Sequence, residues 1–110
     1  MASVKHIVID QGTTFTLTVN VSDANNNSLN LTGYTLRSQM RKSYATNTFV
    51  AFTVTSEAPI SGDLTISLTG SQTSAIKSGR YVYDIEIVDL EENVTRVLEG
   101  IITVTPEVTR

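Results

Sequence analysis

The amino-acid sequence predicts an all-β domain, an antiparallel β-sandwich of about seven strands with one short helical turn near residues 71-78. Threonine, valine, isoleucine and tyrosine dominate the composition, which favours half-buried pleated surface. Runs of alternating apolar and polar residues recur along the chain. Polar or glycine-containing turn sequences separate these runs at the short spacing typical of a sandwich or small barrel.

The bulk composition limits what the domain can do. Its 110 residues fit one domain, spanning 1-110. The net charge of −3 argues against a broad basic surface, so neither nucleic acid nor an anionic membrane is an expected partner. The absence of cysteine excludes disulfides and thiolate metal sites. The first residues lack the apolar core of a signal peptide, which is compatible with synthesis in a reducing cytoplasm.

Seven alternating stretches account for the expected strands. The clearest is TTFTLTVNV, in which every second residue is apolar and threonines take the other face. The polar cluster SDANNNS that follows reads as a turn. The other stretches are VKHIVI, YTLRSQMRK, FVAFTVT, DLTISL and two runs within residues 78–104.

One segment, GSQTSAIKSG at residues 70–79, has no alternation. Ser71 is a residue type that caps helices, so we expect it to start a single helical turn containing Ala75 and Ile76. Gly79 can adopt the left-handed conformation that ends such a turn.

Gly79, Tyr81 and Tyr83 form a G-x-Y-x-Y arrangement directly after that segment. In immunoglobulin-type sandwiches a tyrosine at the start of strand F hydrogen-bonds back to the preceding loop, and the residue two positions later points into the core. We therefore expect Tyr81 to form this structural corner. Tyr83 stands where antibody domains keep a cysteine, and its ring can fill that space if its hydroxyl finds a partner. The alternative is that both are ordinary strand aromatics.

Four charged residues are expected to face one another on neighbouring strands of this sandwich. Opposite charges across a ladder contribute roughly 0.2–1 kcal/mol each, which would help to fix the register. A catalytic role would need a cleft and a shifted pKa, for which the sequence gives no argument. The predicted cross-strand pairs join Arg37 and Arg41 to Asp84 and Glu86.

The last two strands are apolar on both faces, although a monomer seldom exposes a large connected apolar patch. One face would pack the core and the other would meet a second chain, giving a homo-oligomer. The alternative is that these outer residues are scattered or covered by the N-terminal segment. The candidate interface comprises Val82, Val88, Val97 and Ile101.

Known chemical motifs fail on inspection, so we expect no enzyme, no cofactor and no metal. Asp23–Asn27 resembles the start of a calcium loop, but Ser28 replaces the required glycine and Tyr34 the closing glutamate. His6 has no second histidine beside it and reads as a strand residue. Gly33 reads as a turn glycine rather than part of a phosphate site.

Several segments, taken in order, resemble a family of small immunoglobulin-like virion proteins from tailed bacteriophages, including cyanophages. A related module begins some phage baseplate proteins. The most specific segments are LTGYT-x-R at 31–37, G-R-Y-V-Y-D at 79–84 and the ending V-T-P-E-V-T-R. The similarity covers nearly the whole chain.

The resemblance implies a virion location and a non-enzymatic structural role at the tail, baseplate, fibre or capsid surface, through contacts with other virion proteins. It carries over no catalytic residues. This chain ends without the receptor-binding region of longer members, which favours an adaptor or decoration role. The alternative is a carbohydrate-binding sandwich, for which Tyr34 and Tyr44 are the remaining candidate aromatics. A secreted adhesin is a weaker alternative, since both a leader and disulfides are lacking.

Overall fold

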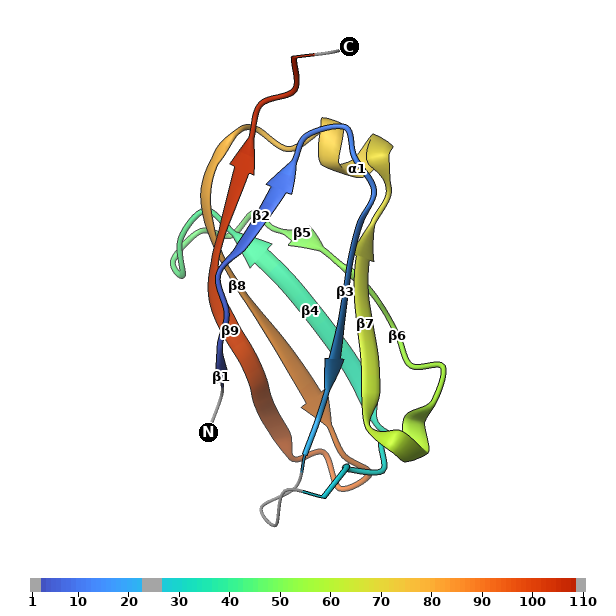
Figure 1. The fold of residues 1–110 in the computed structure, drawn as a ribbon. Helices are drawn as coiled ribbons and strands as arrows, with labels where there is room; N and C mark the ends of the chain where they lie inside the picture. The colour runs from blue at the N-terminus through green and yellow to red at the C-terminus, as the bar shows by residue number, and fades with distance from the viewer. Residues whose placement is uncertain (1–2, 23–26, 109–110) are drawn as a thin grey trace.

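The computed structural model describes residues 3–22 and 27–108, which form two β-sheets packed face to face (Figure 1). The first sheet contains β1 (Ser3–Val4), β2 (Ile7–Asp10), β4 (Thr35–Arg41), β5 (Val50–Ala51), β8 (Gly79–Val88) and β9 (Val94–Thr105). The second contains β3 (Phe15–Asn20), β6 (Thr53–Thr55) and β7 (Asp63–Leu68). A 3-10 turn, η1 (Pro59–Ser61), precedes β7, and a short helix, α1 (Gly70–Ser74), joins β7 to β8.

The strand order identifies the architecture. The six-stranded sheet runs β1-β9-β8-β4-β5, with β2 also pairing with β9, and the three-stranded sheet runs β3-β7-β6. Successive antiparallel pairs along the chain, β4–β5, β6–β7 and β8–β9, thus belong to alternate sheets, as in immunoglobulin-like sandwiches. The predicted β-sandwich class is confirmed. The described residues form nine strands where about seven were expected, because VKHIVI divides into β1 and β2 and FVAFTVT into β5 and β6.

The N-terminal strands differ from the expectation that every pair is antiparallel. Both β1 and β2 run parallel to β9, with Ile7 opposite Ile102 and Asp10 opposite Thr105. The chain then turns at Gly12, whose φ of 81° is left-handed, and crosses to the other sheet as β3. The first strands therefore lie beside the last strand, which leaves β3 at the edge of its own sheet.

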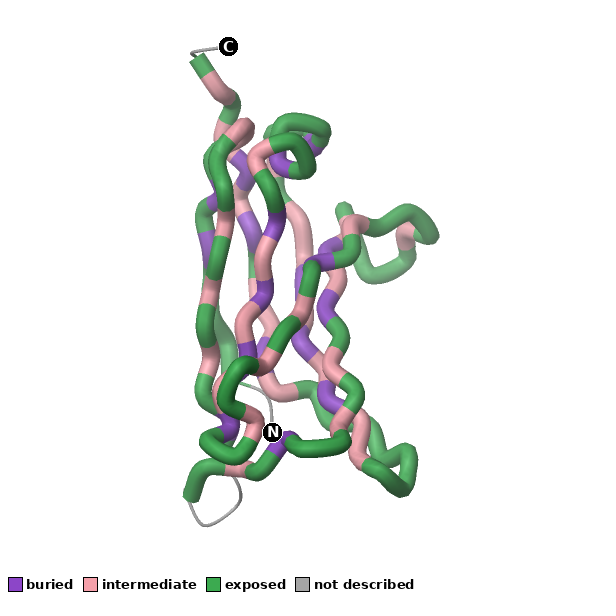
Figure 2. Tube along the Cα trace, turned by 90° about the vertical axis from the view of Figure 1, so that its right-hand side faces the viewer, coloured by how far each residue is buried: buried purple, intermediate pink, exposed green. Residues whose placement is uncertain are grey.

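The core lies between the two sheets and is almost wholly aliphatic. Figure 2 shows the buried positions alternating with intermediate or exposed ones along the strands, as the period of two requires. The fully buried large residues are Ile9, Met40, Leu64, Ile66, Leu68, Ile85, Ile102 and Val104. Tyr83 joins this cluster with 3% of its surface exposed.

Helix α1 lies in the segment where a helical turn was predicted, but it begins and ends at residues other than those expected. Thr69, not Ser71, is the N-cap: its side chain accepts from the Gln72 backbone N–H, and the Gln72 side chain accepts from the Thr69 N–H. This reciprocal capping box stabilises a start two residues earlier than expected. The helix ends at Ser74 with Ala75 as its C-cap, and Gly79 is the first residue of β8. No helix in the described part of the chain has the length and apolar character needed to cross a membrane.

The segment 31–37 forms the turn that leads into β4. Leu31 is buried, and its N–H donates to the carbonyl of Pro59 over 2.7 Å. Gly33 has a φ of 84°, so it is the turn glycine that the sequence predicted. The N–H of Tyr34 closes the turn on the Leu31 carbonyl at 3.0 Å.

Candidate functional site

The outer face of the six-stranded sheet gathers most of the predicted site residues. Strands β4 and β8 are antiparallel, with Arg37 opposite Glu86 and Arg41 opposite Val82. Residues two apart along a strand share a face, so the odd-numbered residues of β4 and the even-numbered residues of β8 point away from the core. The buried Met40 and Ile85 point the other way.

Tyr81 forms the hydrogen bond expected of a tyrosine corner. Its hydroxyl donates to the carbonyl of Lys77 over 2.8 Å, which ties the start of β8 to the loop after α1. Burial raises the pKa of Tyr81, so the hydroxyl remains a donor at neutral pH. The Lys42 Nζ lies 4.9 Å from the centre of its ring, a cation–π contact. Gly79 has a φ of 140°, and a Cβ there would lie 2.6 Å from the Lys42 Nζ.

Tyr83 joins β8 to the N-terminal segment. Its hydroxyl donates to the carbonyl of Lys5 over 2.7 Å, and burial raises its pKa to about 12. Gly100 stands opposite Tyr83 on β9, where an added Cβ would lie 2.1 Å from the Lys5 carbonyl oxygen. The buried ring thus has the hydroxyl partner that a buried tyrosine needs, and Gly100 leaves room for the chain segment that supplies it.

Two ion-pair groups cross the outer face. Arg37 Nε lies 2.7 Å from Glu86 Oε1, as predicted across the β4–β8 ladder. Asp84 pairs instead with Arg96 on β9, with 3.2 Å between Nε and Oδ2. The Arg96 guanidinium also lies 3.9 Å from Glu99. Asp84, Glu86 and Glu99 therefore each have an arginine beside them, whereas Asp10 on β2 accepts a hydrogen bond from the Thr105 hydroxyl.

The predicted carboxylate partner of Arg41 is wrong. Arg41 Nη1 donates to the Thr46 carbonyl at 2.6 Å, and Nη2 donates to Gln39 Oε1 at 3.1 Å. Its guanidinium carbon lies 4.9 Å from the centre of the Phe49 ring. Arg41 is the last residue of β4, so its side chain contacts the Thr46 carbonyl and the Phe49 ring of the following loop instead of a carboxylate.

Sequence reasoning missed Arg96 because β9 contains a bulge. Ile85 pairs with Leu98, but the next residue, Glu86, pairs with Arg96, so Val97 is the extra residue between them. A bulge shifts every side chain beyond it to the opposite face from the one that simple alternation gives. The broken alternation of β9, apolar on both sides, was the signal for this bulge.

Asp84 lies on β8, the middle strand of this sheet. Burial raises its pKa, and the Glu86 carboxylate raises it further, while Arg96 and Arg37 lower it in part. Its own backbone carbonyl accepts a hydrogen bond of 2.6 Å from the buried Ser38 hydroxyl. These contacts fix β8 against β4 at the centre of the sheet.

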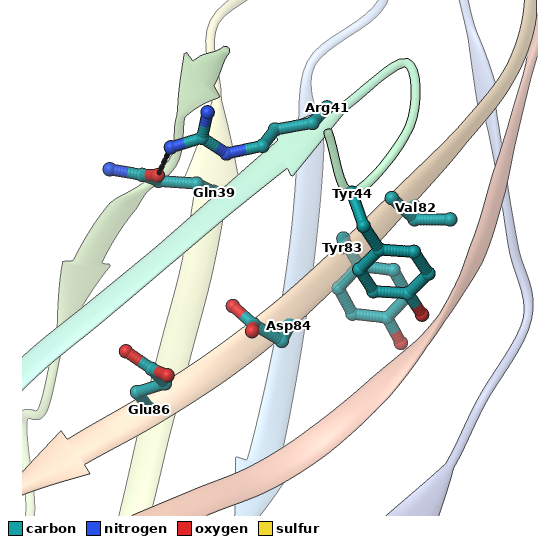
Figure 3. A pocket seen from close by; sticks show the side chains of 7 residues that line it. All are labelled: Gln39, Arg41, Tyr44, Val82, Tyr83, Asp84 and Glu86. Carbon is teal, nitrogen blue, oxygen red and sulfur yellow. Dashed lines mark hydrogen bonds between the residues drawn. The ribbon is translucent and has the colours of Figure 1, made fainter. Parts of the chain in front are cut away.

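A shallow groove lies between β4 and β8 beneath the loop that carries Tyr44 (Figure 3). It has a volume of about 260 Å³ and is lined by Gln39, Arg41, Tyr44, Val82, Tyr83, Asp84 and Glu86. Figure 3 shows Asp84 and Glu86 following one another along β8, with Gln39 and Arg41 on the adjacent β4. Tyr44 is 70% exposed, so its ring is available to a ligand, whereas Tyr34 packs against the core.

The four apolar residues of the candidate interface do not form one patch. Val82 lies opposite Ile101 at one end of the β8–β9 pair, and Val88 lies opposite Val94 at the other. The charged pairs Asp84–Glu99 and Glu86–Arg96 lie between them, and Val97 packs against the core. The continuous apolar surface that was expected is therefore interrupted by charges. The exposed Val4 and Val8 on β1 and β2 were missed, since the sequence did not show that these strands border β9.

The remaining candidate residues either make structural contacts or lie outside the described residues. His6 Nδ1 accepts a hydrogen bond of 3.2 Å from the Ile101 N–H, so it helps to hold the N-terminal segment on β9. The calcium-like stretch falls largely on residues 23–26, which lie outside the described part. Elsewhere, over 3–22 and 27–108, no group of three or more His, Cys, Asp or Glu residues is placed to hold a metal ion.

Comparison with known proteins bears on the fold. No protein-family model and no curated protein matches the chain. Among solved structures, the Listeria monocytogenes internalin-like protein lmo2027 is similar over 94% of this chain at 17% identity and a TM-score of 0.51. The match spans 28% of that protein's length. Tim-1 aligns over 100% of this chain and 99% of its own, at 15% identity and a TM-score of 0.46. The strand topology identifies the chain as a small immunoglobulin-like β-sandwich domain, and the first of these similarities shows that a similar fold occurs in another solved structure.

Proposed function

We propose that this chain is a non-enzymatic structural component of a tailed-phage virion, acting through contacts with other virion proteins. The observation that carries the proposal is the ordered resemblance of segments 31–37, 79–84 and the C-terminal end to small virion proteins of this class. A position at the tail, baseplate or fibre, or on the capsid, fits the resemblance equally.

Two of those segments occupy positions where this fold has specific needs. Segment 31–37 supplies the buried Leu31 and the left-handed Gly33 of the turn into β4. Segment 79–84 supplies the tyrosine corner and the buried Tyr83. A relative that shares these segments would therefore share the turn and the corner, which supports a comparison of whole domains rather than of isolated short matches.

The outer surfaces also favour binding over catalysis. The carboxylates of Asp84 and Glu86 are paired with Arg96 and Arg37, so they act as contacts between neighbouring strands. The outer face of the three-stranded sheet consists mainly of hydroxyl side chains. Such surfaces can adhere to a neighbouring protein but offer little for general acid–base chemistry, which needs a poised group in a cleft.

The proposal is tested by mass spectrometry of purified phage particles. We expect peptides of this chain in particles that survive density-gradient purification, at a constant ratio to the major capsid protein across gradient fractions. Host ribosomal proteins, which should fall away across the same fractions, are the matched control. Absence of the chain from such particles would overturn the proposal.

A second function, carbohydrate binding, is favoured by one observation. Tyr44 is 70% exposed at the rim of a groove that also presents the amide of Gln39 and the carboxylates of Asp84 and Glu86. Aromatic rings beside polar groups are what sugar-binding sites offer. A glycan array would support this function if binding were lost in Tyr44→Ala but kept in Ile60→Ala, since Ile60 is equally exposed outside the groove. No binding by the unmodified chain would reject it.

A further inference from the structure

Strand β3 forms a bare sheet edge, which here means an edge without a second pairing strand, a charged residue or a proline. It pairs with β7 on one side, and no other described strand pairs with it on the other (Figure 1). It is six residues long, FTLTVN, and carries no charge and no proline. The other outer strands are less suited to pairing with an added strand, because they are short or charged: β5 has two residues, β6 has three, and β2 carries Asp10. Natural proteins usually protect a long edge with charge, proline or a bulge.

The backbone groups of β3 that face this edge can be identified. The Val21 N–H donates to the Gly62 carbonyl at 2.8 Å, one step beyond the pairing of Asn20 with Asp63. Backbone groups alternate sides along an antiparallel strand, so the odd-numbered residues bond to β7. Thr16, Thr18 and Asn20 therefore direct their N–H and C=O groups to the free edge.

The side chains of β3 are also incompletely covered. Its inward residues Phe15, Leu17 and Val19 are only half-buried. On the adjacent β7, the inward residues Leu64 and Ile66 are fully buried. An added strand would cover the half-buried row as well as satisfy the free backbone groups.

We propose that the strand added to this edge is the β3 strand of a second copy of this chain, paired antiparallel about a twofold axis. Strict alternation makes β3 self-complementary when the axis passes through Leu17 or Thr18. Residues of the same parity then lie opposite one another, so apolar side chains meet apolar ones. Because β3 has no charged residue, the two copies meet there without repulsion between strands. The two three-stranded sheets become one continuous sheet.

This inference stands independently of the virion function, because it concerns the purified chain alone. It also uses a different surface from the outer face of β8 and β9. A phage particle could contain the chain without a β3 pair, and a β3 pair could form in a protein that no particle contains.

The test is the mass of the chain in solution, measured by light scattering and sedimentation equilibrium over a concentration series. We expect the unmodified chain to dimerise. Thr18→Pro removes a backbone N–H that faces the edge, and Thr18→Lys adds a charge there, as natural edges do. Each should raise the dimer dissociation constant about tenfold or more, since at least one hydrogen bond per copy is lost or two like charges are brought together.

Thr55→Lys is the matched control. Thr55 lies in the same cross-strand row as Thr18, both opposite Thr65, but on β6 at the other edge of the sheet. This variant should dimerise like the unmodified chain. Circular dichroism and thermal unfolding check that each variant is folded, and Thr18→Lys keeps the test valid if Thr18→Pro is not.

Cysteine cross-linking gives the register, since the chain contains no cysteine of its own. An axis through Thr18 predicts a disulfide between two Thr18→Cys chains. An axis through Leu17 predicts one between Thr16→Cys and Thr18→Cys chains. A monomer at the highest soluble concentration, an oligomer that both Thr18 variants leave intact, or one that Thr55→Lys disrupts would each overturn the proposal.

Discussion

The two sheets of this sandwich share a core but present opposite kinds of outer face. On the six-stranded sheet, ion pairs cross β4, β8 and β9, and the N-terminal segment is tied to Tyr83. On the three-stranded sheet, apart from Asn20 and Asp63, the outward residues are Thr16, Thr18, Thr53, Thr55, Thr65 and Ser67. The Thr18 and Thr65 hydroxyls lie 3.0 Å apart.

This difference separates the surface that fixes the fold from the surface that can receive a partner. Asp84, Glu86 and Glu99 on the first sheet are already paired with Arg37 and Arg96, so a protein that bound there would have to displace those pairs. The second sheet offers neutral hydroxyls and a bare edge at β3, which a partner can approach without breaking internal contacts.

The largest effect is expected where the six-stranded sheet is anchored. Tyr83→Ala should lower the free energy of unfolding by about 3–5 kcal/mol, because it empties a buried aromatic site. It also leaves the Lys5 carbonyl without its donor. Tyr44→Ala, at an exposed tyrosine, should change stability by no more than about 0.5 kcal/mol. Urea unfolding measures both, and equal effects would contradict the role assigned to Tyr83.

The N-terminal strands should detach before the rest of the sheet. Gly100→Ala places a methyl group against the Lys5 backbone and should cost about 1–3 kcal/mol. Hydrogen exchange should show lost protection in β1 and β2, with β3 and β7 unchanged. Thr95→Ala, exposed on the same strand, is the control. Undiminished protection of Ile7 and Ile9 would contradict the close contact at Gly100.

Double-mutant cycles should distinguish the outer faces by their response to salt. The Arg37–Glu86 cycle should give a coupling of about 0.2–1 kcal/mol that shrinks as salt is added. The Thr18–Thr65 cycle should give a coupling that salt leaves unchanged, because neither side chain is charged. A Thr18–Thr65 coupling that changes with salt would contradict the distinction between the two outer faces. Arg41 and Asp84, which form no ion pair, should show no coupling and serve as the control.

The smallest effect concerns pH. Asp84 has a raised pKa, so the folded state binds its proton more readily than the unfolded state, and stability should fall as pH rises through its titration range. Asp89 has a pKa lowered by its hydrogen bonds with Asn93, so stability should instead fall as pH drops. Urea unfolding over a pH series gives the slope of stability against pH. Asp84→Asn and Asp89→Asn should change this slope in opposite directions. A change in the same direction for both would contradict the environment described for Asp84.

The fold was predictable because local patterns determine it. Strict alternation in 13–21 and 63–68 predicted strands, and the spacing of Tyr81 and Tyr83 predicted a corner whose hydrogen bond is present. The helical turn was expected in the right segment, but its cap was misplaced because Thr69 and Gln72 reciprocate in a way that single-residue preferences do not reveal.

The contacts of the site were less predictable because they depend on register. The bulge at Val97 changes which β9 residues face outward, so Arg96 was not expected beside Asp84. Arg41 was assigned a carboxylate partner because the loop that captures it lies outside the strand pattern. The bare edge of β3 follows from the parallel pairing of β2 with β9, which no local alternation indicates.

Cryo-electron microscopy of the purified phage particle would show both where this domain lies and which of its surfaces contacts a neighbour. We expect density for this sandwich on the tail, baseplate, fibre or capsid, with the β3 edge in contact with a neighbouring chain and the ion-paired face of β4, β8 and β9 turned away from that contact. A particle reconstruction at side-chain resolution that lacks the domain would contradict the proposed function. Density in which the charged face is buried and β3 is open to solvent would contradict the division between the two sheets.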